Sequence, residues 1–336
     1  MKIAHLTAAL AVAAGLALGA ASQAHAAKEL VVTMDTAPGH LRTRMMKEFL
    51  ARLEKRSGGE LTAKLYDSSQ LYSSRDAAKA VARGDAGFTV LVTPYLSRIS
   101  PDINVFDLPV LNGMSDEQRA AMLDRNLGDT LAAGLQQKMG VVVPGHFWSM
   151  GKVMIWSTAK PINRFADMKG MKVRIPGGAA VVMRMDAIEA AAVAMPGNDV
   201  PLALQQGVVD ATMGGAEWVL TNKLIDAGIR HGFWDQGIIG YLMPILNKAY
   251  WAALNADQKE LFTEVWNEVT DEQRQAILAE ETEHWAQLNK IGISIVSAAD
   301  DDVAQANQAM LKVQDQMIEK LGISEAVVRL AKEAVK

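Results

Sequence analysis

The sequence predicts an α/β protein built from two domains. Segments that favour strands alternate with segments that favour helices along nearly the whole chain, which is typical of this class. The length of 336 residues exceeds one ordinary domain of about 100–200 residues. Because no repeat, low-complexity tract or flexible linker separates the halves, we expect the domains to exchange strands rather than to be joined by a tether.

Residues 1–26 have the pattern of a secretory signal peptide. Lys2 supplies a positive charge, Leu6–Leu18 is an apolar run, and Ala24–Ala26 matches a signal-peptidase site. The alternative, a transmembrane anchor, needs about 20 continuous apolar residues, and polar Ser22 and Gln23 follow this shorter run. We expect cleavage after Ala26, which leaves 310 residues (336 less 26).

The composition excludes several classes of protein. The chain has no cysteine, so disulfides, thiolate catalysis, zinc–thiolate sites and a lipid-modified cysteine are excluded. Without the leader, 33 Lys and Arg (34 less Lys2) oppose 38 Asp and Glu, a net charge of about −5. This balance argues against nucleic acid and against polybasic contact with a membrane. No later segment is apolar enough to insert into a bilayer, and we expect a protein exported to a Gram-negative periplasm.

The first predicted domain alternates strands with helices that end at glycine, such as Gly58 and Gly84. Its expected strands are Lys28–Met34, Leu61–Tyr66, Gly87–Val92 and Val141–Val143. Its expected helices are Gly39–Arg56, Ser74–Arg83 and Ser115–Lys138.

A second alternating set begins near Lys152. Its expected strands are Lys152–Ser157, Met171–Ile175, Ala211–Met213 and Leu242–Asn247, and its expected helices are Ala179–Glu189 and Val200–Gln206. We therefore assign residues 27–151 and about 240–270 to the first domain, and residues 152–239 and about 271–322 to the second.

Three helices complete the predicted fold. Ala256–Lys290 contains neither Gly nor Pro, with Asn255 able to cap its start and Gly292 to end it. We favour one long helix lying along both domains over two helices that meet near Thr270. The last two expected helices are Asp300–Leu321 and Ser324–Ala334, with residues 323–336 as a separate C-terminal helix.

Catalytic and metal-binding motifs are absent from the sequence. There is no G-x-S-x-G elbow, no H-E-x-x-H helix and no G-x-G-x-x-G after a strand. The segment Gly145–Lys152 has the wrong spacing for a phosphate loop, and Val153 stands where Ser or Thr is needed. The histidines outside the leader are scattered, and the acidic run Asp300–Asp302 is explained by helix capping. We therefore expect no enzyme, no cofactor and no metal site.

Arg174 carries the clearest chemical signal in the chain. It ends a short apolar strand, and Pro176, Gly177 and Gly178 then turn the backbone into a helix. An arginine offers bidentate, charge-assisted hydrogen bonds to a carboxylate, and a helix N-terminus adds free N–H groups. On spacing alone, a surface salt bridge is an equal alternative to a ligand site.

Two motifs around this arginine point to a known family. They are MKGMKVRIPGG (168–178) and MPGNDVPLALQQGVVDAT (195–212), and four other segments agree in order and spacing: GHLRTRMMKEFLARLEKRSGGEL, SSQLYSSRDAAKAVARGDAGF, INVFDLP and AKPINRFADMKG. Together they resemble the periplasmic solute-binding subunits of TRAP transporters, the DctP-like family, over about Glu29–Asn289.

The resemblance implies a two-domain flytrap with an interdomain ligand cleft and a long bracing helix. Arg174 then matches the family arginine that pairs with the ligand carboxylate, and residues near His40, Gln70 and Thr93 face it from the other lobe. The partners implied are a small carboxylate ligand and membrane-embedded TRAP permease subunits driven by an ion gradient. An ABC-type or sensor-partner binding protein and a periplasmic enzyme acting on organic acids stay open as alternatives.

Several positions depart from the family pattern. Lys152 is the nearest candidate for a second basic residue, Val92 stands at an acidic position of sialic-acid-type members, and Gly177, Gly197 and Gly214 replace larger residues. We expect these changes to enlarge the pocket and make it less polar, which suits an acid with an apolar or aromatic body. The aromatic residues that could pack on such a body, or equally belong to the core, are Phe147, Trp148 and Trp218.

Overall fold

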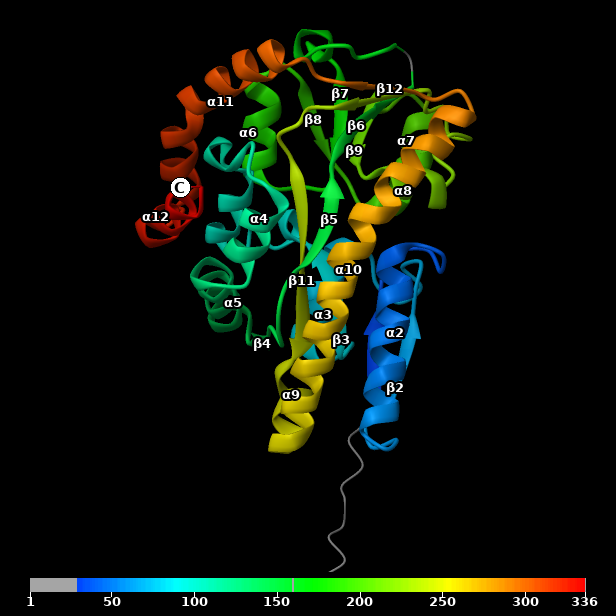
Figure 1. Ribbon diagram of the computed structural model, residues 1–336, viewed down its shortest axis with the longest axis vertical. Helices are drawn as coiled ribbons and strands as arrows, with labels where there is room; N and C mark the ends of the chain where they lie inside the picture. Colours follow the sequence, from blue (N-terminus) through cyan, green and yellow to red (C-terminus); the bar gives the residue numbers. More distant parts are fainter. Residues whose placement is uncertain (1–28, 159, 336) are drawn as a thin grey trace, which may run out of the picture.

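The computed structural model describes residues 29–158 and 160–335, so the predicted signal peptide lies outside the described residues. Two mixed sheets lie one above the other along the long axis of the molecule, each covered by helices (Figure 1). We call the part built on the first sheet the first lobe and the part built on the second sheet the second lobe. This arrangement confirms the predicted two-domain α/β fold.

The sheet of the first lobe has the strand order β2-β1-β3-β11-β4, and β5 also pairs with β11. β1 is parallel to β2 and β3, whereas β11 is antiparallel to β3, β4 and β5. Its strands are β1 (Leu30–Thr33), β2 (Ala63–Tyr66), β3 (Phe88–Val92), β4 (Val141–Val142), β5 (Trp148–Lys152) and β11 (Ile239–Asn247).

The sheet of the second lobe has the strand order β12-β10-β6-β9-β7-β8. β7 is parallel to both of its neighbours, so the carboxyl ends of β7, β8 and β9 meet at one edge. Its strands are β6 (Met154–Ser157), β7 (Lys172–Ile175), β8 (Ala191–Ala194), β9 (Ala211–Gly214), β10 (His231–Trp234) and β12 (Ser294–Ser297).

The lobes are joined where β5 and β11 run side by side (Figure 1). β5 leads directly into β6, and β11 follows β10 after four residues. At this junction the N–H of Val153 donates to the carbonyl of Ile238 at 3.2 Å. The chain thus crosses between the lobes on two neighbouring strands, as the absence of a flexible linker predicts.

Helices cover both sheets. On the first lobe they are α2 (Leu41–Arg56), α3 (Ser74–Arg83), α4 (Asp116–Leu123), α5 (Asn126–Met139), α9 (Lys248–Ala253) and α12 (Glu325–Ala334). On the second lobe they are α6 (Ala179–Ala187), α7 (Val200–Gln205), α8 (Ala216–Thr221) and α11 (Asp300–Leu321). The 3-10 turns are η1 (Thr93–Tyr95), η2 (Pro101–Asp107), η3 (Pro109–Leu111), η4 (Phe165–Met168) and η5 (Gly197–Asp199).

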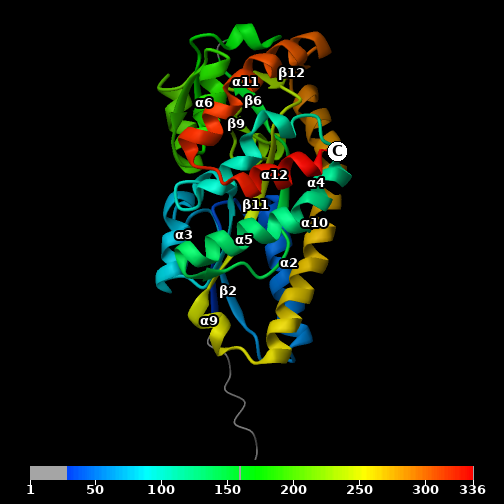
Figure 2. The same ribbon diagram turned by 90° about the vertical axis from the view of Figure 1, so that its left-hand side faces the viewer.

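α10 (Ala256–Lys290) is one continuous helix, as predicted, and it runs along one side of both lobes (Figure 2). Asn255 and Gln258 form a capping box at its start. Its first half buries Trp266 in the core of the first lobe, while Leu288 packs in the core of the second. The buried Gln273 near its middle bonds to both the N–H and the carbonyl of Ser149 in β5.

The predicted helix Ser115–Lys138 is wrong in one respect: it consists of two helices, α4 and α5. Asp124 ends the first helix, and its carboxylate accepts two hydrogen bonds from Arg274 of α10, at 2.6 and 2.8 Å. Arg125 then adopts an extended backbone before α5. The two helices pack so closely that a Cβ on Gly128 would lie 1.7 Å from the carbonyl oxygen of Leu123. A tertiary ion pair therefore breaks a segment whose local sequence favours a single helix.

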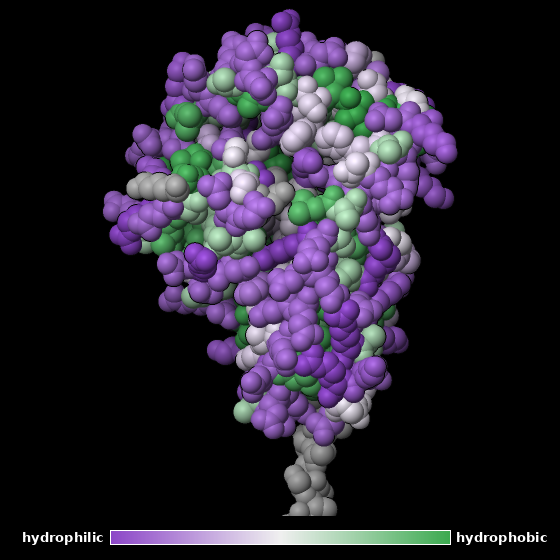
Figure 3. All heavy atoms as spheres, in the orientation of Figure 1, coloured by the Kyte–Doolittle hydropathy of each residue, from purple (hydrophilic) through white to green (hydrophobic). Residues whose placement is uncertain are grey.

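The surface of the described residues is mainly hydrophilic on the face that Figure 3 shows. Apolar residues lie there in separate small areas. Within residues 29–158 and 160–335, no helix has both the length and the apolar character needed to cross a membrane.

Candidate functional site

A cavity lies between the two lobes, and elements from both of them line it. It contains about 1140 Å³ of atom-free space, counting the part that opens to solvent. The first lobe contributes Asp35, His40, Arg42, Thr93, Tyr95 and Phe106, the second contributes Arg174, Pro176, Gly197, Gly214, Glu217 and Trp218, and the connecting elements contribute Lys152, Gly240, Ile277, Glu281 and His284.

Arg174 lies on β7 at the edge where three parallel strands end. Its side chain is held there by backbone carbonyls of the second lobe. Nε and Nη2 donate to the carbonyl of Met195, at 3.0 and 2.8 Å, and Nη1 lies 3.4 Å from the carbonyl of Met213. Only 4% of the residue is exposed, so the guanidinium is both fixed and largely desolvated.

The charge of Arg174 has no carboxylate partner among the described residues. Nη2 lies 3.3 Å from the hydroxyl of Tyr95, which belongs to the opposite lobe. Its Cζ lies 5.3 Å from the centre of the Trp218 ring, a cation–π distance. Burial lowers the pKa of Arg174, but an arginine stays protonated in proteins. A buried cation held only by neutral groups can gain a charge-assisted bond from an anion that enters the cavity.

Trp218 occupies the space beside two of the predicted glycine positions. A Cβ on Gly214 would lie 2.5 Å from Cε3 of Trp218, and a Cβ on Gly197 would lie 3.6 Å from Cζ2 of the same ring. At Gly214 the expectation of an enlarged pocket is therefore corrected, because the indole fills the space of the missing side chain. At Gly197 the distance is an ordinary van der Waals contact, so the indole does not require a glycine there. The cavity wall at this point is an aromatic ring packed against the guanidinium of Arg174.

Of the predicted site residues Gly177 and Thr93, only Thr93 lines the cavity. Gly177 has φ of 144°, a conformation that only glycine adopts readily, and it is not among the residues that line the cavity. A Cβ at this position would meet only the carbonyl of Pro94, at 4.0 Å. Thr93 lines the cavity at the start of η1, where the fully buried strand β3 ends.

Lys152 lies at the end of β5 and lines the cavity, but its charge is already paired. Its Nζ is 2.8 Å from Oε2 of Glu281 on α10, and it lies 4.8 and 5.3 Å from the ring centres of Trp234 and Trp285. The N–H of Lys152 also donates to Oε1 of Glu281, at 2.8 Å. Lys152 thus ties the interlobe strand to α10 and differs in this from the uncompensated Arg174.

Besides Gly177, two predicted site residues lie outside the cavity. Gln70 is exposed, and its Nε2 donates to Asp67 at 3.3 Å. Trp148 is fully buried, stacks on Trp266 with ring centres 4.8 Å apart, and donates from Nε1 to Thr270. For Trp148 the core alternative therefore holds, because the first residue of β5 points at α10. Phe147 is likewise buried in the core of the first lobe.

The structure brings charged residues to the cavity that the sequence did not single out. Nη2 of Arg42 donates to Asp35 at 2.9 Å, and the other oxygen of Asp35 accepts from the hydroxyl of Ser74 at 2.6 Å. Nε of Arg42 is buried and has no hydrogen-bond partner within the described part of the chain. The available signal was the position of these residues, since Asp35 lies two residues after the end of β1 and Arg42 is the second residue of α2.

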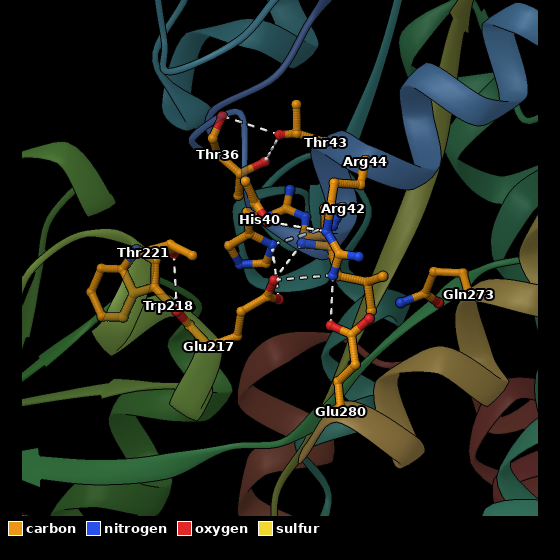
Figure 4. Close-up of polar contacts among 12 residues, drawn as sticks. Thr36, His40, Arg42, Thr43, Arg44, Glu217, Trp218, Thr221, Gln273 and Glu280 are labelled. Atoms are coloured by element: carbon orange, nitrogen blue, oxygen red, sulfur yellow. Dashed lines mark hydrogen bonds and ion pairs between the residues drawn. The ribbon is translucent and has the colours of Figure 1, made fainter. Parts of the chain in front are cut away.

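His40 lies at the start of α2, where it faces a carboxyl group of the second lobe. Its Nδ1 accepts from the N–H of Arg42 at 3.2 Å and lies 3.1 Å from Oε2 of Glu217 (Figure 4). Oε1 of Glu217 accepts from the N–H of Leu41. Burial raises the pKa of Glu217 to about 7, while burial and the nearby Arg42 hold the pKa of His40 well below its ordinary value.

One group of side chains has the ligand types for a metal ion. Single ligand atoms of Glu217, Glu280 and His284 lie within 4.8 Å of one another. Arg44 already supplies a positive charge to this group, because its Nη2 lies 2.6 Å from Glu280 and 3.9 Å from Glu217. Since a guanidinium neutralises these carboxylates, we assign no metal to them.

Two α/β lobes enclose a small-molecule cavity, and a fixed cation in its wall has no carboxylate partner among the described residues. These features define a solute-binding protein of the flytrap type. The chain belongs to the DctP family, bacterial extracellular solute-binding protein family 7, whose family model matches residues 32–321. This match confirms the family resemblance that the motifs around Arg174 predict.

Individual relatives agree with this assignment. The C4-dicarboxylate-binding periplasmic protein DctP of Rhodobacter capsulatus is 28% identical over 299 residues, which cover 87% of this chain and 86% of that protein. A TRAP periplasmic solute-binding protein of Desulfovibrio salexigens with bound orotic acid has a TM-score of 0.86 at 20% identity, covering 91% of this chain and 98% of the other. One from a Sulfitobacter species with bound β-D-galacturonate has a TM-score of 0.84 at 22% identity, covering 91% and 100%.

Proposed function

We propose that this protein captures a small organic acid between its lobes in the periplasm and delivers it to a membrane-embedded TRAP permease. The observation that carries the proposal is the state of Arg174: buried, fixed by three bonds to backbone carbonyls, and without a carboxylate partner among the described residues. A ligand carboxylate supplies that partner. Binding requires no covalent chemistry, so the protein acts as a carrier and not as an enzyme.

The chemistry of the cavity walls favours an acid with an apolar or aromatic body. Trp218 lies against the anchoring guanidinium, and its ring offers a flat surface for stacking. The remaining walls include apolar side chains from both lobes and from α10, namely Val92, Phe106, Met150, Val153, Val181, Met213, Ile238 and Ile277. A polyhydroxylated sugar acid would leave many of its hydroxyl groups against these walls without hydrogen-bond partners.

Ligand capture then proceeds by closure of the lobes. A solute that contacts both Arg174 of the second lobe and Tyr95 of the first binds the closed arrangement better than an open one. It therefore shifts the population toward closure by its difference in affinity. The closed form is the one we expect to dock on the permease.

The direct test is mass spectrometry of the small molecule released when the purified protein is denatured. A thermal-shift panel then compares dicarboxylates, sugar acids and aromatic or branched acids, with the matching amides as controls. We expect acids with apolar bodies to raise the melting temperature and their amides to have no effect. Stabilisation by sugar acids alone would reject the apolar ligand.

Two other functions remain to be separated by experiment. Neighbouring genes that encode an ABC transporter or a membrane sensor, in place of a TRAP permease, would assign the protein to that partner. A periplasmic enzyme would convert an acid during prolonged incubation. We expect every acid that stabilises the protein to be recovered unchanged.

A further inference from the structure

The lobes touch at a second place besides the Arg174 anchor, and this contact is built on Glu217. Glu217 belongs to α8 of the second lobe, directly after β9. Its carboxyl group meets the N-terminus of α2 in the first lobe, where Oε1 accepts from the N–H of Leu41 and Oε2 faces His40 (Figure 4). Only 6% of Glu217 and 6% of His40 are exposed, so the contact is closed to solvent.

A hydrogen atom has to lie between Nδ1 of His40 and Oε2 of Glu217, which are 3.1 Å apart. Nδ1 of His40 already accepts from the N–H of Arg42, as the N-cap of α2, so it presents a lone pair. Oε2 of Glu217 lies 3.1 Å away, and among the described residues it has no hydrogen-bond donor. Two lone pairs at this distance repel each other, whereas a proton between them makes an ordinary O–H···N bond.

The carboxyl group is the better holder of that proton. A hydrogen on Nδ1 of His40, including the ring hydrogen that a neutral histidine already carries, would point at the N–H of Arg42, and the cap would be lost. A hydrogen on Glu217 instead lets the single lone pair of Nδ1 accept from both donors. Burial raises the pKa of Glu217 to about 7, and burial with Arg42 and Arg44 depresses the pKa of His40. Both shifts favour a neutral carboxylic acid that donates to a neutral imidazole.

The charged groups around the contact come from two helices. Arg42 and Arg44 on α2 favour the ionised form of Glu217, while Glu280 on α10 opposes it and is itself paired with Arg44 at 2.6 Å. His284 on α10 also faces His40, and Glu281 on α10 is paired with Lys152. Because positive and negative neighbours offset one another, the desolvation of Glu217 decides its protonation state.

We propose that Glu217 is the positioning residue for lobe closure, and that the lobes close with one proton held between its carboxyl group and Nδ1 of His40. In an open form Glu217 is hydrated and ionised above its ordinary pKa, so closure takes up a proton. The contact therefore favours closure at low pH, and this contribution is lost as the pH rises through about 7. This proposal rests on the proposed function in one respect, namely that the lobes close when the solute is captured.

The test measures closure without any ligand, so its outcome is independent of the proposed function. A Cβ on Gly178 of the second lobe would lie 3.2 Å from Cβ of Pro94 in the first lobe, slightly less than the Cβ–Cβ distance of a disulfide, and Gly178 has φ of 87°, so a cysteine there is strained. Since the chain has no other cysteine, Pro94→Cys with Gly178→Cys gives a single defined pair. Its equilibrium with glutathione reports the closed population even when that population is small.

The comparison is between backgrounds with Glu217 and with Glu217→Gln, at pH values from 6 to 8. A glutamine has the shape of the protonated acid, because its amide can donate to His40 and accept from Leu41. The quantity compared is the equilibrium constant for disulfide formation with glutathione. We expect this constant for the Glu217 protein, divided by that for the Glu217→Gln protein, to fall roughly tenfold as the pH rises from 6 to 8. Thiol ionisation and strain at the cysteines are common to both and cancel.

Two further variants complete the test. Glu283→Gln, an exposed neighbour on α10, should follow the Glu217 protein at every pH. At pH 6, Glu217→Ala should have a smaller closed population than the protein with Glu217 and the protein with Glu217→Gln. A ratio that stays constant from pH 6 to 8, or a Glu217→Gln protein with the same pH dependence as the parent, overturns the proposal.

Discussion

The guanidinium of Arg174 and the phenol of Tyr95 face each other across the cavity, with Nη2 and Oη 3.3 Å apart. The two residues come from different lobes, one from β7 and the other from η1. Burial raises the pKa of Tyr95, so its hydroxyl is neutral and leaves the positive charge of Arg174 uncompensated. The group that anchors a ligand is therefore also a point where the lobes meet.

Replacing Arg174 by alanine should abolish tight binding of acids. Removal of one partner of a desolvated charge pair costs about 2–5 kcal/mol, or roughly 30-fold to several-thousand-fold in Kd. Calorimetry on the acid identified by mass spectrometry gives the value directly. Arg329→Ala, an exposed arginine on α12, is the control and should bind as the parent does. Unchanged affinity in Arg174→Ala would remove this residue from the site.

Lys152 should contribute much less to affinity than Arg174, because Glu281 already compensates its charge at 2.8 Å. The double variant Lys152→Met with Glu281→Gln removes both charges together and keeps the size of the side chains. We expect its Kd to lie within about threefold of the parent, since it leaves no buried charge unpaired. A loss as large as that of Arg174→Ala would instead make Lys152 a ligand residue.

The fit between Gly214 and Trp218 can be measured by a double-mutant cycle. A methyl group added by Gly214→Ala would lie 2.5 Å from the indole and displace it, at a cost of about 1–3 kcal/mol in the free energy of unfolding. In a Trp218→Ala background the same methyl group meets open space and should cost little. Urea denaturation of the four proteins gives the coupling energy, and strictly additive effects would contradict the contact.

Trp148→Phe separates a core role from a role in ligand binding. The change removes the stacking on Trp266 and the hydrogen bond to Thr270, which should lower the free energy of unfolding by about 1–3 kcal/mol. Ligand affinity should stay within about twofold of the parent, because Trp148 does not line the cavity. Weaker binding without loss of stability would return Trp148 to the site.

Much of the fold could be predicted because local patterns and tertiary contacts agree. The helix Ala256–Lys290 was predicted to the residue, since Asn255 caps it and no Gly or Pro interrupts it. The sequence did not predict the strands β5, β8, β10 and β12. Three of them have four residues each, and alternation over so few residues is too weak a signal.

Site residues could be predicted where a local motif fixes the backbone. They could not be predicted where two lobes meet. Arg174 stands at a strand end followed by Pro176 and two glycines. This spacing alone left a surface salt bridge as an equal alternative, and the family resemblance favoured the ligand site. Glu217 follows Gly214 and Gly215 in the sequence, but its partner His40 is 177 positions away. Such a contact depends on how the lobes approach each other, which no local spacing encodes.

The unbroken course of α10 has a mechanical consequence. Its first half is packed tightly into the first lobe through Trp266 and Gln273, and its last turns reach the second lobe at Leu288. A rigid rod held at both ends resists rotation of one lobe against the other, so opening has to bend it or shift one end. In the proposed closure, the outward side of this helix therefore moves together with the cleft, and we expect the proposed permease to recognise the closed form at this surface.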